Sequence, residues 1–121
     1  MLQNMKKLAF AATMTAFGAQ SAAAEEHVVI ITGSSFFPQV TYVDPSDTVR
    51  FVNESSTTQS INGQDGNWEV LNIPNGGAAT LTIVEGMKNQ YTGDGFTSAE
   101  TGETITPTGS ISFANPPLGS I

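Results

Sequence analysis

The chain from Glu25 to Ile121 shows no helical periodicity. No stretch of about a dozen residues there repeats apolar side chains three or four positions apart, as an amphipathic helix requires. Short β-branched or alternating runs recur instead between strong turn signals, which include Asn-Gly at 62–63 and Asp-Gly at 65–66. Six to eight short strands at this spacing predict an all-β domain with the architecture of a β-sandwich.

Three segments carry specific expectations about this sandwich. Val49 and Phe51 alternate with Arg50, which predicts a strand whose apolar face is turned to the core. By the same spacing, Val40 and Tyr42 are expected to share one face. The segment 92–108 is polar and rich in Gly and Thr, so we expect a long loop between strands there.

The first 24 residues have the features of a Sec-type signal peptide. Lys6 and Lys7 form a basic start, residues 8–19 form a short apolar core, and 22–24 is the Ala run that suits a signal peptidase. An apolar core of this length is too short to span a bilayer, so no membrane anchor is expected. We predict a signal peptide over 1–24, one exported domain over 25–121, and a periplasmic or secreted location in a bacterium.

The composition excludes several classes of function. Loss of Lys6 and Lys7 on export takes the formal net charge from −7 to −9 and leaves only Arg50 and Lys88 as fixed cations. Nucleic-acid binding requires clustered Lys and Arg, so that class of partner is excluded. The chain contains no Cys, which excludes disulfides, a thiolate nucleophile, Cys-ligated zinc and iron–sulfur clusters.

Several motifs occur together in the order found in one family. They are the Phe-Phe-Pro run at 36–38, DTVRFVN at 47–53, the polar loop that follows from Glu54, Trp68, and the Glu-Gly and Tyr at 85, 86 and 91. In this order they resemble a cupredoxin, the fold of the small blue copper proteins. The resemblance covers nearly all of the exported domain. It implies a single cupredoxin-like Greek-key β-sandwich.

The metal ligands of that family are missing from this chain. A type 1 copper site needs two His, one Cys and usually a weak axial Met. The resemblance places the first of these His at Gln59, with Thr58 in place of the family's Pro. The remaining ligands are expected after Tyr91, where the segment 92–108 contains no Cys, His or Met. Without the thiolate, no blue copper centre and no tuned one-electron couple can form, so copper electron transfer is the least supported function.

His27 is the sole His, and it would be the third residue after cleavage behind Ala24. A free amine, two backbone amides and a His at the third position form a square-planar chelate that suits Cu(II) or Ni(II). Glu25 and His27 are therefore the candidate metal residues, with Cu(II) or Ni(II) as the ion that this motif would take. The simpler interpretation is a solvent-facing His before the first strand.

Nothing in the sequence indicates catalysis. The carboxylates are scattered rather than paired, and Asp44 and Asp47 have the spacing of turn residues. A Ser-His-Asp arrangement would require the terminal His27 to fold inward, so a hydrolase ranks below both the interaction module and the amino-terminal chelate. Trp68 and the two Phe at 36 and 37 are expected in the core.

The sequence thus favours an exported, non-enzymatic binding or interaction module of cupredoxin type without a type 1 copper site. No cofactor is expected, and a protein partner is. The loops Glu54 to Ser60 and Thr92 to Thr108 are expected to meet at one end of the sandwich, which is the best candidate for partner contact because function commonly lies on loops. The alternative is periplasmic Cu(II) or Ni(II) binding through the Glu25-Glu26-His27 chelate.

Overall fold

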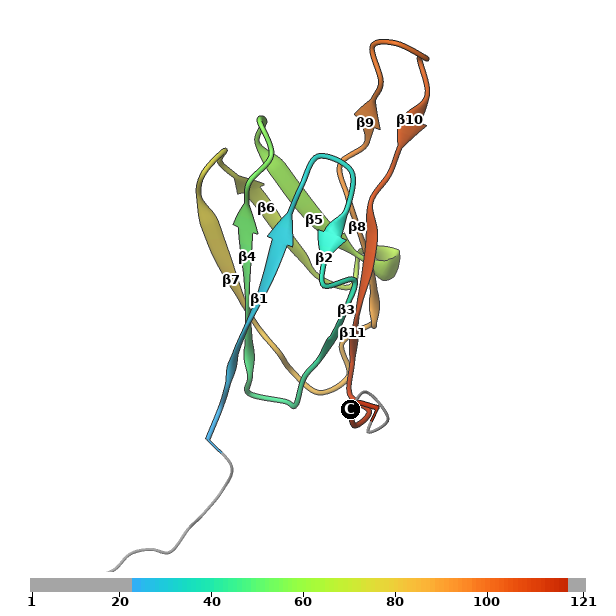
Figure 1. Cartoon of the computed structure of the whole chain (residues 1–121). Coiled ribbons are helices and arrows are strands. Elements are labelled where there is room, and N and C mark those ends of the chain that lie inside the picture. Colours follow the sequence, from blue (N-terminus) through green and yellow to red (C-terminus); the bar gives the residue numbers. More distant parts are fainter. Residues whose placement is uncertain (1–22, 118–121) are drawn as a thin grey trace, which may run out of the picture.

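The computed structural model describes residues 23–117. Two sheets face one another, one with strand order β2-β1-β4-β7 and the other with strand order β3-β11-β8-β5-β6, and the ribbon β9-β10 stands apart (Figure 1). A short 3-10 turn, η2, joins β5 to β6. The elements are β1 (Glu26–Ile31), β2 (Phe36–Phe37), β3 (Val40–Tyr42), β4 (Thr48–Asn53), β5 (Gln59–Gly63), η2 (Gln64–Gly66), β6 (Glu69–Ile73), β7 (Ala78–Thr82), β8 (Gln90–Gly93), β9 (Phe96–Thr97), β10 (Thr104–Ile105) and β11 (Thr108–Ser112).

The all-β sandwich predicted from the sequence is confirmed. The described residues form eleven strands instead of six to eight, because three two-residue strands, β2, β9 and β10, accompany the eight longer ones. The predicted signal peptide lies, apart from its last two residues, outside the described part of the chain. No helix within 23–117 has the length and apolar character needed to cross a membrane.

The core fills the space between the two sheets and centres on Tyr91. The ring of this residue makes edge contacts with Phe36 and Phe51, at centroid distances of 4.9 Å and 5.6 Å, and lies 5.7 Å from the ring of Trp68. Aromatic pairs in these orientations stabilise a core beyond the area that they bury. The prediction that Trp68 and Phe36 belong to the core is therefore confirmed, whereas the prediction for Phe37 is wrong because its side chain is exposed.

The alternation predicted for β4 is confirmed, and Val40 and Tyr42 share one face of β3 as predicted, which is the outer face. Val49 and Phe51 are fully buried. In β3, however, Val40 is 40% exposed and Thr41 is buried. The cause is the register with β11, which places Thr41 opposite the buried Ile111. Successive side chains of a strand point to opposite faces, so this register turns Val40 outward.

The segment 92–108 is not one long loop. β9 pairs with β10 in an antiparallel hairpin in which Ile105 lies opposite Phe96. Its turn is closed by hydrogen bonds from the Gly102 N–H to the Ser98 carbonyl and from the Ser98 N–H to the Glu103 carbonyl, both 2.8 Å long. Gly102 has a φ of +75°, which glycine adopts without strain. The hairpin projects beyond the end of the sandwich (Figure 1).

Candidate functional site

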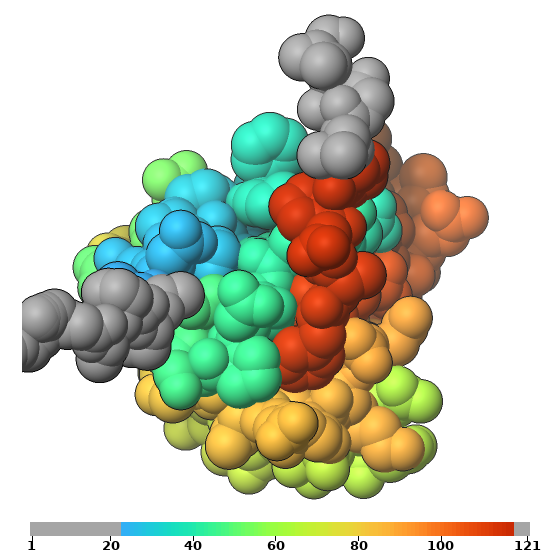
Figure 2. Space-filling model, turned by 90° about the horizontal axis from the view of Figure 1, so that it is seen from below, coloured from blue at the N-terminus to red at the C-terminus, as the bar shows by residue number. Residues whose placement is uncertain are grey.

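The two predicted metal residues lie together at the end of the sandwich where β1 begins. β1 pairs in parallel with β4, and the register sets Glu26 opposite Thr48. This register brings the residues that flank the start of each strand side by side. We call Glu25, His27 and Asp47 the amino-terminal cluster. Figure 2 shows this end of the molecule, where the start of β1 in blue lies against the turn before β4 in green.

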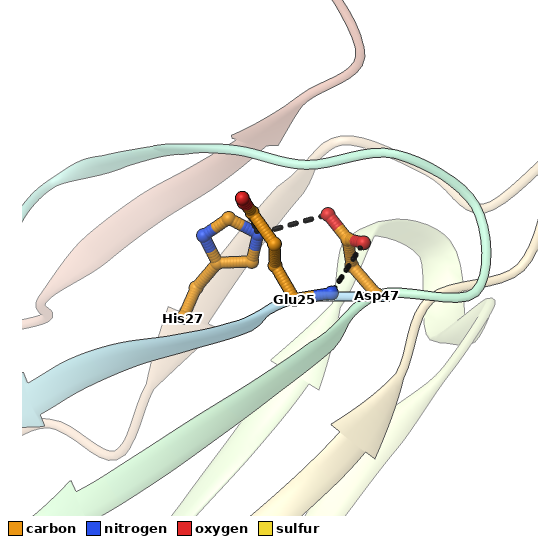
Figure 3. A group of neighbouring side chains, drawn as sticks. All are labelled: Glu25, His27 and Asp47. Carbon is orange, nitrogen blue, oxygen red and sulfur yellow. Dashed lines mark hydrogen bonds and ion pairs between the residues drawn. The ribbon is translucent and has the colours of Figure 1, made fainter. Parts of the chain in front are cut away.

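The side chains of the amino-terminal cluster point toward one another (Figure 3). The His27 Nε2 atom lies 2.9 Å from Asp47 Oδ2 and 3.9 Å from Glu25 Oε1. One ligand atom from each residue can be chosen so that all three lie within 4.8 Å of one another. The Asp47 side chain is buried, that of His27 is partly buried, and that of Glu25 is 73% exposed. The cluster thus consists of the His27 imidazole and the Asp47 carboxylate, which are held in place, and the Glu25 carboxylate, which is free to move beside them.

Asp47 is held by the backbone on both sides. Its Oδ1 atom accepts the Glu25 N–H at 3.0 Å, and its Oδ2 atom accepts the Asp44 N–H at 2.9 Å. These two bonds, with the bond to His27, lower the pKa of the Asp47 carboxyl from 3.8 to about 2, the bond from Glu25 having the largest effect. Asp47 also donates its own N–H to the Asp44 carbonyl at 3.0 Å, so the turn predicted from the sequence is present. Its carboxylate additionally ties that turn to the start of β1.

The amino-terminal chelate predicted from the sequence requires a different arrangement. It would use the Glu25 nitrogen and the next two backbone amides together with the His27 ring. In the fold, the Glu25 N–H is donated to Asp47, and His27 lies within the ladder opposite Val49. The first residues of β1 would have to leave β4 before the chelate could form. The side chains, in contrast, already converge without any change of the backbone.

Two shallow hollows border the amino-terminal cluster. One, of about 190 Å³, lies beside Glu25, Asp47 and residues 44–46. The other, of about 130 Å³, lies between the same two carboxylates and the segment 114–116. Both are polar and large enough for a few water molecules. Solvent therefore reaches the carboxylate side of the cluster.

The opposite end carries the loops at which the sequence predicts partner contact. Asp94 Oδ2 accepts the Ser60 N–H at 3.1 Å, and Ile61 lies opposite Gly93 in the ladder between β5 and β8. The predicted loop segments 54–60 and 92–108 therefore meet, as the sequence predicts. We call these two loops the loop end.

Gln59 and Asn53 are the buried polar residues of the loop end. Gln59 donates its Nε2–H to Thr57 Oγ1 at 2.9 Å, and its Oε1 atom is buried without a hydrogen-bond partner among residues 23–117. Asn53 donates its Nδ2–H groups to the carbonyls of Thr57 and Ile73 at 2.8 Å and 2.9 Å, and its Oδ1 atom accepts the Ser55 N–H. These side chains are engaged in holding the loop, and the importance of Asn53 for the loop was not predicted from the sequence.

The surface of the loop end combines apolar and acidic side chains. Phe96 and Ile105, which face one another across the hairpin, are 45% and 43% exposed. The exposed carboxylates of this end are Glu54, Asp94, Glu100 and Glu103. Of the two fixed cations in the described residues, Arg50 lies within β4 and Lys88 Nζ lies 3.9 Å from Asp65 Oδ2. The loop end is therefore acidic and carries no Lys or Arg.

Comparisons with known proteins assign no function to either site. The chain matches no protein-family model, and it matches no curated protein. Function is therefore inferred from the geometry of the loop end and of the amino-terminal cluster.

Proposed function

We propose that this chain is an exported cupredoxin-like β-sandwich that lacks the type 1 copper site and acts as a non-enzymatic binding module for a protein partner. The observation that carries this proposal is the loop end. Its two loops are joined by the hydrogen bond from the Ser60 N–H to Asp94. However, Gln59 occupies the position at which the resemblance places the first copper ligand. The segment 92–108 supplies no Cys, His or Met.

The chemistry of Gln59 supports a binding role over electron transfer. Its amide is buried and donates to Thr57, so it holds the loop rather than presenting a ligand to solvent. A blue copper centre depends on a thiolate bond to the metal, which a chain without Cys cannot make. Copper electron transfer therefore ranks last among the functions of this fold.

The partner that suits the loop end is a protein with an apolar patch surrounded by basic residues. Exposed Phe96 and Ile105 offer the apolar centre that protein interfaces bury. The surrounding carboxylates would attract a basic partner and orient it during encounter. This combination makes association both specific and dependent on salt.

A photo-crosslinking residue placed at position 96 tests this proposal in the cells that export the protein. We expect a discrete protein adduct at 96, weaker at raised ionic strength and lost when Ile105→Ser is added. The matched control is position 84, since Val84 is equally apolar and exposed but follows Ile83, whose N–H bonds to the Asp47 carbonyl at the opposite end. The proposal fails if position 96 gives no adduct or the same adducts as position 84.

The second candidate function is Cu(II) or Ni(II) binding through the amino-terminal Glu25-Glu26-His27 chelate. The observation that favours it is the spacing, because His27 would be the third residue of a chain that begins at Glu25. A Cu(II) titration of the processed protein, followed in the visible range, tests it. A pale violet band that disappears in His27→Ala is the expected result. Its absence in protein shown by mass spectrometry to begin at Glu25 would exclude the chelate.

A further inference from the structure

We propose that the side chains of Glu25, His27 and Asp47 form a binding site for a divalent cation of the zinc class. The donors are one imidazole nitrogen and two carboxylate oxygens, and the site requires no free amino terminus. It differs from the amino-terminal chelate in its ligand set, because Asp47 takes part and the backbone amides do not. It is also independent of the binding role proposed for the loop end.

The distances within the amino-terminal cluster fit a shared ion. Zinc bonds to His nitrogen and carboxylate oxygen are ~2.0–2.2 Å long, which places neighbouring ligand atoms ~3.0–3.5 Å apart. The His27–Asp47 separation is 2.9 Å and the His27–Glu25 separation is 3.9 Å. The three ligand atoms lie within 4.8 Å of one another, so a small opening of the first pair and a rotation of the Glu25 side chain toward the other two would bring them to that spacing. Glu25 can make this approach at little cost because its side chain is mostly exposed.

Two of the three ligands are already fixed in position. The Glu25 and Asp44 N–H groups would remain on the Asp47 carboxylate when the ion replaces the His27–Asp47 hydrogen bond. Backbone donors that orient a ligating carboxylate raise metal affinity. His27 is held by the pairing of β1 with β4. The ion would therefore bind without a change in the sheet.

The ligand types and the open side of the site indicate the class of metal. A mixed imidazole and carboxylate set suits zinc and its first-row neighbours, whereas Ca²⁺ takes six to eight oxygen ligands. Three protein ligands leave coordination positions for water. The hollow of about 190 Å³ beside Glu25 and Asp47 gives that water access.

Calorimetric titration with ZnCl₂ tests the site in two forms of the protein. One is the processed protein, and the other is the full-length chain, in which the Glu25 nitrogen is part of a peptide bond. We expect binding of one Zn²⁺ per chain in both forms. Glu25→Gln and His27→Gln should each weaken it at least ~10-fold, since even residues that only support a ligand contribute this much. Glu26→Gln is the matched control, because Glu26 is an exposed neighbour in β1, and it should retain the wild-type affinity within about twofold.

A second measurement separates the site from a general effect of acidic side chains. His27 is the only His in the chain, so its imidazole signals are unique in an NMR spectrum, and they should move on addition of Zn²⁺ but not of Ca²⁺. The proposal is overturned if wild-type protein gives no saturable heat, or if Glu26→Gln weakens binding as much as Glu25→Gln. It is also overturned if only the processed protein binds, since the ion then belongs to the chelate.

Discussion

The loop end and the amino-terminal cluster hold their polar side chains in opposite ways. At the loop end, the side chains of Asn53 and Gln59 are buried and bond within the protein. Asn53 donates to the carbonyls of Thr57 and Ile73, and Gln59 donates to Thr57 Oγ1. At the amino-terminal cluster, the side chains of three residues converge on a place that solvent reaches. The two ends lie on opposite sides of the molecule, the loop end with the β9–β10 hairpin and the cluster beside the start of β1 (Figure 1).

This difference shows that the fold alone does not determine where side chains able to bind a metal lie. In the cupredoxin-like module that we propose, the copper site of that family would correspond to the loop end, where this chain offers an amide that holds its own loop. Groups able to ligate an ion lie instead where a parallel strand pair brings the beginnings of β1 and β4 together. A fold provides positions for side chains, and the side chains at those positions determine the function. Substitutions at each end test whether the two ends differ in this way.

Asn53→Ala should destabilise the protein more than any other change at either end. The variant removes the side-chain donor of the buried Ile73 carbonyl, one donor of the Thr57 carbonyl and the acceptor of the Ser55 N–H. A loss of ~2–4 kcal/mol in the free energy of unfolding is expected, because buried polar groups lose their partners. Urea unfolding monitored by circular dichroism measures it.

The matched control for this change is Asn75→Ala. Asn75 is exposed, and its Nδ2–H donates one long bond of 3.3 Å to the Ser56 carbonyl. Its loss should cost less than ~0.5 kcal/mol, as is usual for surface positions. Equal losses in the two variants would show that the buried amide does not organise the loop end.

Asp47→Asn should destabilise the metal-free protein by ~1–2 kcal/mol at neutral pH, because the ionised carboxylate is the acceptor of three hydrogen bonds. The pKa of Asp47 is about 2 in the folded protein against 3.8 for the free group. A lowered folded pKa stabilises above the unfolded pKa, so this contribution is complete above pH ~4 and is lost as the pH falls toward ~2. Urea unfolding at pH 6 and pH 2.5 should show the difference between wild type and variant shrinking in acid.

Asp65→Asn provides the control for Asp47→Asn. The Asp65 side chain is 72% exposed and lies 3.9 Å from Lys88, and exposed pairs of this kind contribute little. The substitution should leave the urea midpoint almost unchanged at both pH values. If the effect of Asp47→Asn is the same at pH 6 and pH 2.5, the contribution does not come from the ionised carboxylate.

The sequence predicts those features that depend on neighbouring residues. The burial of Val49 and Phe51 follows from local alternation, and so does the exposure of Arg50 between them. The strands of the 96–105 hairpin were not predicted, because two residues are too few to show a period. For the same reason the strand count was too low.

Contacts between distant residues account for the other differences. His27 and Asp47 are twenty positions apart, and their contact depends on the parallel register of β1 with β4. No short-range pattern encodes such a register. The sequence therefore indicated His27 and Glu25 as candidate metal residues, whereas it indicated only a turn residue at Asp47. Which face of β3 is buried is likewise set by a parallel register, with β11.

Gln59→Met should have the smallest effect, although it alters the buried residue at the expected position of a copper ligand. Met has a similar shape and would lose the 2.9 Å bond from Nε2 to Thr57 Oγ1. It would also remove a carbonyl oxygen that is buried without a partner within residues 23–117, and burying such a group costs about as much as one hydrogen bond contributes. The two effects oppose each other, so the free energy of unfolding should stay within ~1 kcal/mol of wild type. Urea unfolding alongside Asn53→Ala measures this directly. A loss above ~2 kcal/mol would show that Gln59, like Asn53, is essential to the loop, and the loop end would then depend on two buried amides rather than one.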